Sequence, residues 1–160
     1  MRRAAEPYVF DKAKYHSGGD WPDDLDPDQA FVHTGIYVAW LIANGLLADS
    51  AFDDDHGREL QQNLLSRRVT GPQLFEQWFD GVLTDQELTD EGDRFSRAYF
   101  DFDKGSYLAD YEELLVGELP DLYHVADTWS NYDVLASRLD QRLADWRQRR
   151  RPWRLRRRHD

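Results

Sequence analysis

The side chains in this sequence that could take part in catalysis or metal binding are histidines with acidic residues near them. His16 and Asp20 share one glycine-rich segment, His33 lies further along, and His124 and Asp127 lie close together late in the chain. Imidazole and carboxylate groups can ligate a divalent metal or act together as an acid–base pair. One hypothesis is therefore a metal-dependent hydrolase that uses His16, Asp20, His33 and His124.

The spacing of these residues matches no catalytic motif. The sequence contains no His-Glu-x-x-His, no paired Glu-x-x-His segments and no Gly-x-Ser-x-Gly, and Gly18-Gly19 is not part of a phosphate-binding loop. A single histidine such as His33 on an apolar face is more often a hydrogen-bonded structural residue, and His16 and His124 can tie the N-terminal loop to a late connector. We therefore favour a protein with no catalytic residue, no metal and no cofactor.

Charge is segregated along the chain. Residues 1–141 carry 29 acidic and 11 basic side chains, a balance of −18, whereas residues 142–160 carry nine arginines and two aspartates, a balance of +7. A negative field of this size attracts cationic partners and repels nucleic acid. The sequence therefore predicts a protein partner with a basic surface and makes nucleic acid an unfavourable ligand.

Two acidic runs, a first over residues 20–28 and a second over residues 53–55, are the strongest candidates for contacts with such a partner. The run at Asp53 lacks the ligand pattern of a calcium loop, because the position that needs a glutamate is Leu64. Such runs form either a solvated face or a docking surface, and Trp21, within the first run, belongs to the residue types that most often anchor interfaces. The candidate partner-binding residues are Asp20, Trp21, Asp23, Asp24, Asp53, Asp54 and Asp55.

The arginine-rich end is open to two interpretations. Residues 147–160 form a basic patch that could bind nucleic acid or anionic lipid. The alternative, which we favour, is a disordered solubilising tail that folds back on the acidic body, because that body repels polyanions over roughly 8 Å at physiological salt.

Composition limits the class of protein. A length of 160 residues predicts one domain, and 41% apolar with 14% aromatic residues argue for a folded, aromatic-rich core. The absence of cysteine excludes disulfides and thiolate sites and fits a reducing compartment. No apolar run reaches the ~18 residues of a membrane span, and no apolar segment of a signal peptide follows the N-terminus. We expect a cytoplasmic protein without membrane contact, and the sequence leaves its oligomeric state open.

Apolar periodicity predicts the elements that position these residues. Helix-start signals occur at Asp26, Thr70, Thr84, Ser106 and Ser130, and a further helix is expected over residues 57–68. Residues 1–27 read as an irregular loop, and no strand is expected. The predicted fold class is all-α, an irregular single-domain bundle of about six helices. The expected organisation is an acidic helical domain over residues 1–146 and a flexible arginine-rich tail over residues 147–160.

Three motifs resemble those of a family of small uncharacterised bacterial proteins. They are a first motif, Asp11-Lys12-Ala13-Lys14-Tyr15-His16-x-x-Gly19-Asp20-Trp21-Pro22; a second, His33-x-Gly35-x-Tyr37-x-x-Trp40; and a third, Leu122-Tyr123-His124-Val125-x-Asp127-Thr128-Trp129-x-Asn131-Tyr132. The resemblance covers residues 8–146 and excludes the arginine-rich tail. It implies a single-domain cytoplasmic protein of a kind often found as the immunity partner of a secreted antibacterial toxin.

These observations favour a non-enzymatic function. The leading hypothesis is an immunity protein that binds and neutralises a cationic toxin or effector domain, such as a nuclease. Electrostatic complementarity would speed the encounter, and partly buried aromatic side chains would hold the complex.

Overall fold

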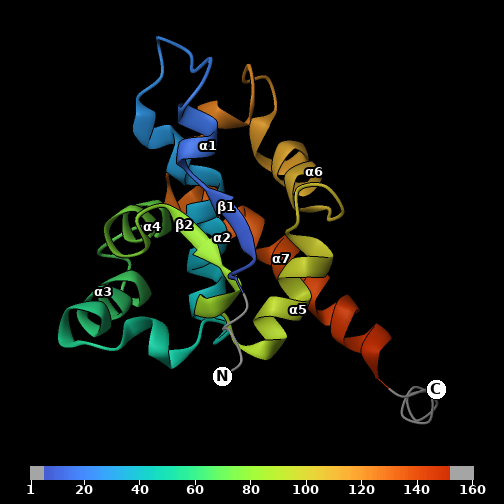
Figure 1. The fold of residues 1–160 in the computed structure, drawn as a ribbon. Coiled ribbons are helices and arrows are strands. Elements are labelled where there is room, and N and C mark those ends of the chain that lie inside the picture. Colours follow the sequence, from blue (N-terminus) through green and yellow to red (C-terminus); the bar gives the residue numbers. More distant parts are fainter. Residues whose placement is uncertain (1–5, 152–160) are drawn as a thin grey trace.

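The computed structural model describes residues 6–151 and is mostly helical (Figure 1). Its α-helices are α1 (Lys14–Ser17), α2 (Val32–Ala43), α3 (Asp55–Leu65), α4 (Gly71–Phe79), α5 (Asp90–Tyr99), α6 (Tyr107–Tyr111) and α7 (Trp129–Arg150). Shorter helical turns are η1 (Pro27–Phe31), η2 (Asp49–Phe52), η3 (Asp85–Glu87), the π-helical η4 (Glu112–Val116) and η5 (Leu122–His124). The prediction of a predominantly helical single domain is confirmed.

Helix α2 is the centre of the molecule. Every residue from Val32 to Ile42 is buried, which explains why this segment is apolar on all sides in the sequence. Asp26 caps the preceding turn η1 by accepting a hydrogen bond from the Asp28 amide at 2.9 Å, with Pro27 in the first position, as the sequence predicts. The helix ends at Ala43, and Gly45 follows with a φ of 66°, the left-handed conformation common just after a helix C-terminus.

Helix α4 packs directly against α2 through glycine. A Cβ atom on Gly71 would lie 2.2 Å from the Gly35 carbonyl oxygen, and one on Gly35 would lie 2.3 Å from the Pro72 Cα. The two backbones can approach this closely only because neither glycine carries a side chain. Gly35, part of the second motif, therefore has a packing role.

Two short strands were missed by the sequence analysis. β1 (Val9–Lys12) pairs antiparallel with β2 (Val82–Thr84), with Val9 opposite Thr84 and Lys12 opposite Val82. Strands of this length give too little alternation to detect, and each depends on a partner distant in the sequence. The expected irregular loop over residues 1–27 therefore contains β1 and α1 in its described part.

The core is rich in aromatic rings, as predicted. Tyr37 stacks on Phe100 with ring centroids 4.3 Å apart, and Tyr107 lies 4.8 Å from Phe100. Trp40, also buried, stacks beside Tyr37 at 5.7 Å and donates its indole N–H to Asp140 at 2.8 Å. This cluster fastens α5, α6 and α7 to the central helix.

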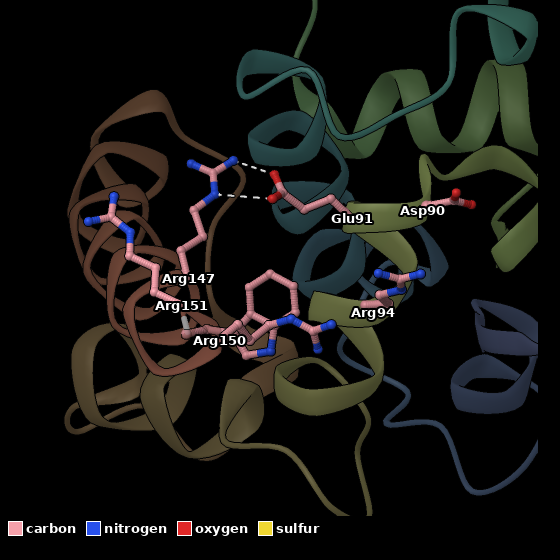
Figure 2. Close-up of a pocket in the computed structure, with 7 residues that line it drawn as sticks. Asp90, Glu91, Arg94, Arg147, Arg150 and Arg151 are labelled. Atoms are coloured by element: carbon pink, nitrogen blue, oxygen red, sulfur yellow. Dashed lines mark hydrogen bonds and ion pairs between the residues drawn. The ribbon is translucent and has the colours of Figure 1, made fainter. Parts of the chain in front are cut away.

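Helix α7 extends beyond the predicted domain boundary. It begins after a Thr128 cap, not at Ser130, and continues through Arg150. Its last turns pack beside α5, where Arg147 forms an ion pair with Glu91 and Arg150 lies over the Trp146 ring at 4.7 Å (Figure 2). The start of the predicted tail is therefore helical, and residues 152–160 lie outside the described residues.

No helix within residues 6–151 combines the length and the apolar character needed to cross a membrane.

Candidate functional site

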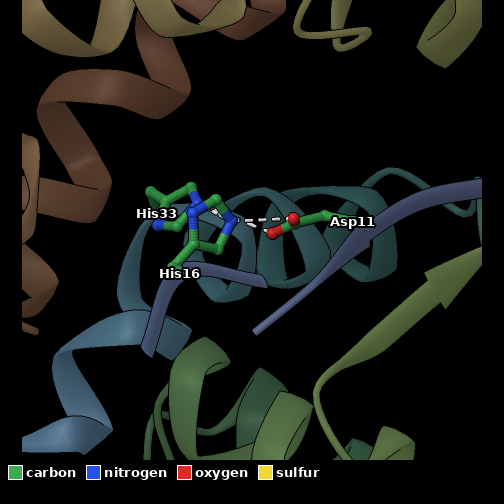
Figure 3. A group of neighbouring side chains, drawn as sticks. All are labelled: Asp11, His16 and His33. Carbon is green, nitrogen blue, oxygen red and sulfur yellow. Dashed lines mark hydrogen bonds and ion pairs between the residues drawn. The ribbon is translucent and has the colours of Figure 1, made fainter. Parts of the chain in front are cut away.

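Asp11, His16 and His33 converge at one point inside the fold (Figure 3). The Nε2 atom of His16 lies 2.8 Å from Asp11 Oδ1 and 3.2 Å from His33 Nε2, and His33 Nε2 lies 3.5 Å from Asp11 Oδ2. Strand β1 supplies Asp11, α1 supplies His16 and α2 supplies His33. Pairing of β1 with β2 places the carboxylate against the central helix.

Hydrogen bonds from neighbouring residues hold this cluster in place. The Thr34 hydroxyl donates to Asp11 Oδ2 at 2.6 Å, and the Tyr123 hydroxyl lies 2.8 Å from His16 Nδ1. The Tyr107 hydroxyl donates to the backbone carbonyl of His33. The cluster thus joins residues from all three sequence motifs.

Burial and hydrogen bonding oppose each other in the electrostatics of the site. The side chains of Asp11 and His33 are 2% and 1% exposed, and that of His16 is 16% exposed. Burial alone would raise the pKa of Asp11, but hydrogen bonds from His16 and His33 outweigh it and hold the pKa well below its ordinary value. Burial lowers the pKa of His33 more than Asp11 raises it, so the ring favours its neutral form.

The structure brings together two of the four residues proposed for a metal-dependent hydrolase. His16 and His33 meet, whereas Asp20 is exposed in the loop that follows α1. His124 lies elsewhere, with Nδ1 2.8 Å from Asp121 and Nε2 3.7 Å from Asp24. The carboxylate at the imidazole pair is Asp11 instead.

Sequence reasoning missed Asp11 as a site residue. Its only signal was its place in the first motif, five residues before His16. Its contact with His33 depends on a strand that was not predicted, so no spacing rule could have revealed it.

The first acidic run forms an exposed end of the molecule. We use the name acidic end for the carboxylates of this loop and two beside it: Glu76, which Asp28 and Asp26 repel, and Asp121, which contacts His124 as Asp24 does. The loop members are Asp20, Asp23, Asp24, Asp26 and Asp28. Trp21, in the same loop, is only half-exposed, because its indole N–H donates to the Leu25 carbonyl at 3.1 Å and its ring lies 5.0 Å from that of Tyr123. These contacts hold the loop against η5.

The second acidic run lies away from the first. Figure 1 shows it at the start of α3, at the opposite end of the molecule from the loop that follows α1. Asp53, Asp54 and Asp55 are exposed, but Asp54 caps α3 by accepting from the Gly57 amide at 2.8 Å, and Asp55 pairs with Arg58 at 2.7 Å. The seven candidate contacts therefore do not form one continuous surface.

A second buried carboxylate, Asp110 on α6, has different partners. Arg142 donates to both of its oxygens, at 2.9 and 2.8 Å, and Arg138 donates to Oδ1 at 2.8 Å. The Tyr99 hydroxyl donates to Oδ2 at 2.6 Å. Burial would raise the pKa of Asp110, but these partners lower it overall.

Comparison with known proteins shows the family of this chain but no function. No curated protein and no solved structure matches the chain. One family model, described as "Domain of unknown function (DUF7832)", matches residues 9–125. That segment contains Asp11, His16, His33 and Tyr123, whereas Arg138 and Arg142 lie beyond it. Because the match spans most of the sequence, the chain belongs to the DUF7832 family of domains of unknown function.

Proposed function

We propose that this protein is a non-enzymatic interaction protein of the immunity type, which binds and neutralises a bacterial toxin or effector domain with a basic surface, such as a nuclease. The acidic end is the observation that carries this proposal. A surface of crowded carboxylates has a favourable interaction with a cationic protein and an unfavourable one with a polyanion.

Charge crowding at the acidic end supports the proposal. Residues 17–28 contain five aspartates and no lysine or arginine. The pKa of Glu76 on α4 is raised, first by its partial burial and then by repulsion from Asp28 and Asp26. Repulsion of this kind is relieved when a cationic partner arrives.

Preorganisation of the same loop adds to the argument. The indole of Trp21 is hydrogen-bonded within the loop and packed on Tyr123. Two hydrogen bonds from the Gln29 side-chain amide, to the carbonyls of Tyr123 and Val125 at 2.9 and 3.0 Å, tie η1 to the same connector. A surface that is already ordered loses little conformational entropy on binding.

The cluster of Asp11, His16 and His33 is poorly accessible, which favours interaction over hydrolysis as the function. Asp11 and His33 are almost completely covered, and His16 alone of the three has appreciable exposure. For hydrolysis, the bond to be cleaved in a substrate would have to approach acid–base groups that solvent barely reaches.

The test is co-expression with secreted toxin domains encoded beside this gene. We expect rescue of growth and a complex on gel filtration with one of them. Failure of both readouts with every such neighbour would overturn the proposal.

Two charge-matched double variants locate the interface. Asp20→Asn with Asp23→Asn removes two charges from the acidic end, and Asp49→Asn with Asp53→Asn removes two exposed charges near the start of α3. We expect the first pair to slow association roughly tenfold at low salt and the second pair to have little effect, because steering depends on local potential. Equal effects would place the interface elsewhere.

A further inference from the structure

Asp11, His16 and His33 bring two imidazole nitrogens and one carboxylate group close enough together to ligate one metal ion. Ligand atoms at 2.0–2.2 Å from a tetrahedral zinc ion lie about 3.3–3.5 Å from one another. The two Nε2 atoms are 3.2 Å apart, and His33 Nε2 is 3.5 Å from Asp11 Oδ2. His16 Nε2 lies closer to the other carboxylate oxygen, 2.8 Å from Asp11 Oδ1, so an ion would take the place of that hydrogen bond.

No single placement of hydrogen atoms on the two Nε2 atoms satisfies every contact of this arrangement. If both Nε2 atoms carry hydrogen, two N–H groups crowd each other across 3.2 Å. If His16 Nε2 carries none, its lone pair faces a carboxylate oxygen at 2.8 Å. If His33 Nε2 carries none, its lone pair faces the other oxygen at 3.5 Å. A cation at the centre would turn all of these lone pairs into ligands.

The buried carboxylate also lacks a permanent positive charge. Within residues 6–151, no lysine or arginine forms an ion pair with Asp11, whose partners are Thr34 and the two imidazoles. Such a carboxylate depends on hydrogen bonds and on imidazoles whose charge changes with pH. A divalent ion would compensate that charge while imidazole supplies the nitrogen ligands that zinc accepts.

We propose that Asp11, His16 and His33 bind one divalent transition-metal ion of the zinc class. The ion links β1, α1 and α2 through three protein ligands. Tyr123 at the Nδ1 atom of His16 and Thr34 at the carboxylate of Asp11 orient two of the ligands, as outer partners do in metal sites.

The test uses the full chain, freed of any histidine tag and stripped with EDTA. Titration with Co²⁺ is expected to produce the visible absorption of a low-symmetry nitrogen and oxygen site at one equivalent, and Zn²⁺ should then displace the cobalt. A raised melting temperature with Zn²⁺ is the second readout. Absence of a one-equivalent cobalt signal together with no zinc-dependent shift would overturn the proposal.

Variants distinguish this site from other histidines. His16→Gln removes a half-buried ligand and should weaken Co²⁺ binding at least ~100-fold, while Tyr123→Phe removes an outer partner and should weaken it about tenfold. His124→Gln is the matched control and should bind as the wild type does, because His124 pairs with Asp121 outside the cluster. Far-UV circular dichroism checks that each variant folds. Unchanged cobalt affinity in folded His16→Gln protein would refute the site.

Discussion

The two buried aspartates of this protein have their charge balanced in different ways. Counted as whole residues, Asp110 and Asp11 are 2% and 3% exposed, and both have a lowered pKa. Asp110 is held by two guanidinium groups and a tyrosine hydroxyl. Asp11 is held by a threonine hydroxyl and two imidazoles, one of which favours its neutral form.

This difference separates a structural site from a candidate binding site. Arginine is always charged, so the Asp110 cluster is complete without any added ion. Imidazole can give its lone pair to a metal once its proton leaves, so the Asp11 cluster can take up a cation. The Asp110 cluster joins α6 to α7, whereas the Asp11 cluster joins the N-terminal elements to the central helix and lies wholly within the family segment.

The largest expected effect is the loss of Asp110. Asp110→Ala leaves the guanidinium groups of Arg138 and Arg142 and the Tyr99 hydroxyl without their shared acceptor. We expect the free energy of unfolding to fall by about 2–4 kcal/mol, less than for a fully buried pair because both arginines can turn toward water. Urea denaturation measures this effect. A loss within experimental error would show that the cluster does not stabilise the fold.

A smaller effect is expected at Asp11 when metal is absent. Asp11→Asn in EDTA keeps an acceptor for Thr34 and for one imidazole, and neutral histidines can change tautomer to suit it. The free energy of unfolding should therefore fall by only about 1–2 kcal/mol. The same urea experiment applies, with Asp110→Asn as the isosteric reference. A greater loss at Asp11 than at Asp110 would reverse the comparison.

Acid should weaken the Asp110 cluster in a predictable direction. Because folding lowers the pKa of Asp110, the unfolded chain takes up its proton first as the pH falls. The stabilisation is therefore complete above the unfolded pKa, about 4, and is lost as the pH falls through the lower folded pKa. The stability difference between wild type and Asp110→Asn, measured at several pH values, should shrink on acidification. A difference that grows in acid would contradict the lowered pKa.

Local signals were enough to predict most of the helical framework. The start signals at Asp26 with Pro27 and at Thr70, and the apolar segment of α2, each depend only on residues close by in the sequence. Boundaries were less accurate where tertiary contacts extend an element. Helix α7 continues past Trp146 to Arg150, and in these last turns Arg147 pairs with Glu91 on α5, a residue far away in the sequence.

The sequence by itself determined the helical class, the aromatic core and the segregation of charge, because each depends on composition or on short-range periodicity. Only the tertiary structure decided that Asp11, not Asp20, meets His16 and His33, and that the two acidic runs lie at different ends. The physical reason is that such contacts arise from the pairing of β1 with β2 and the packing of helices on α2, which join residues far apart in the chain.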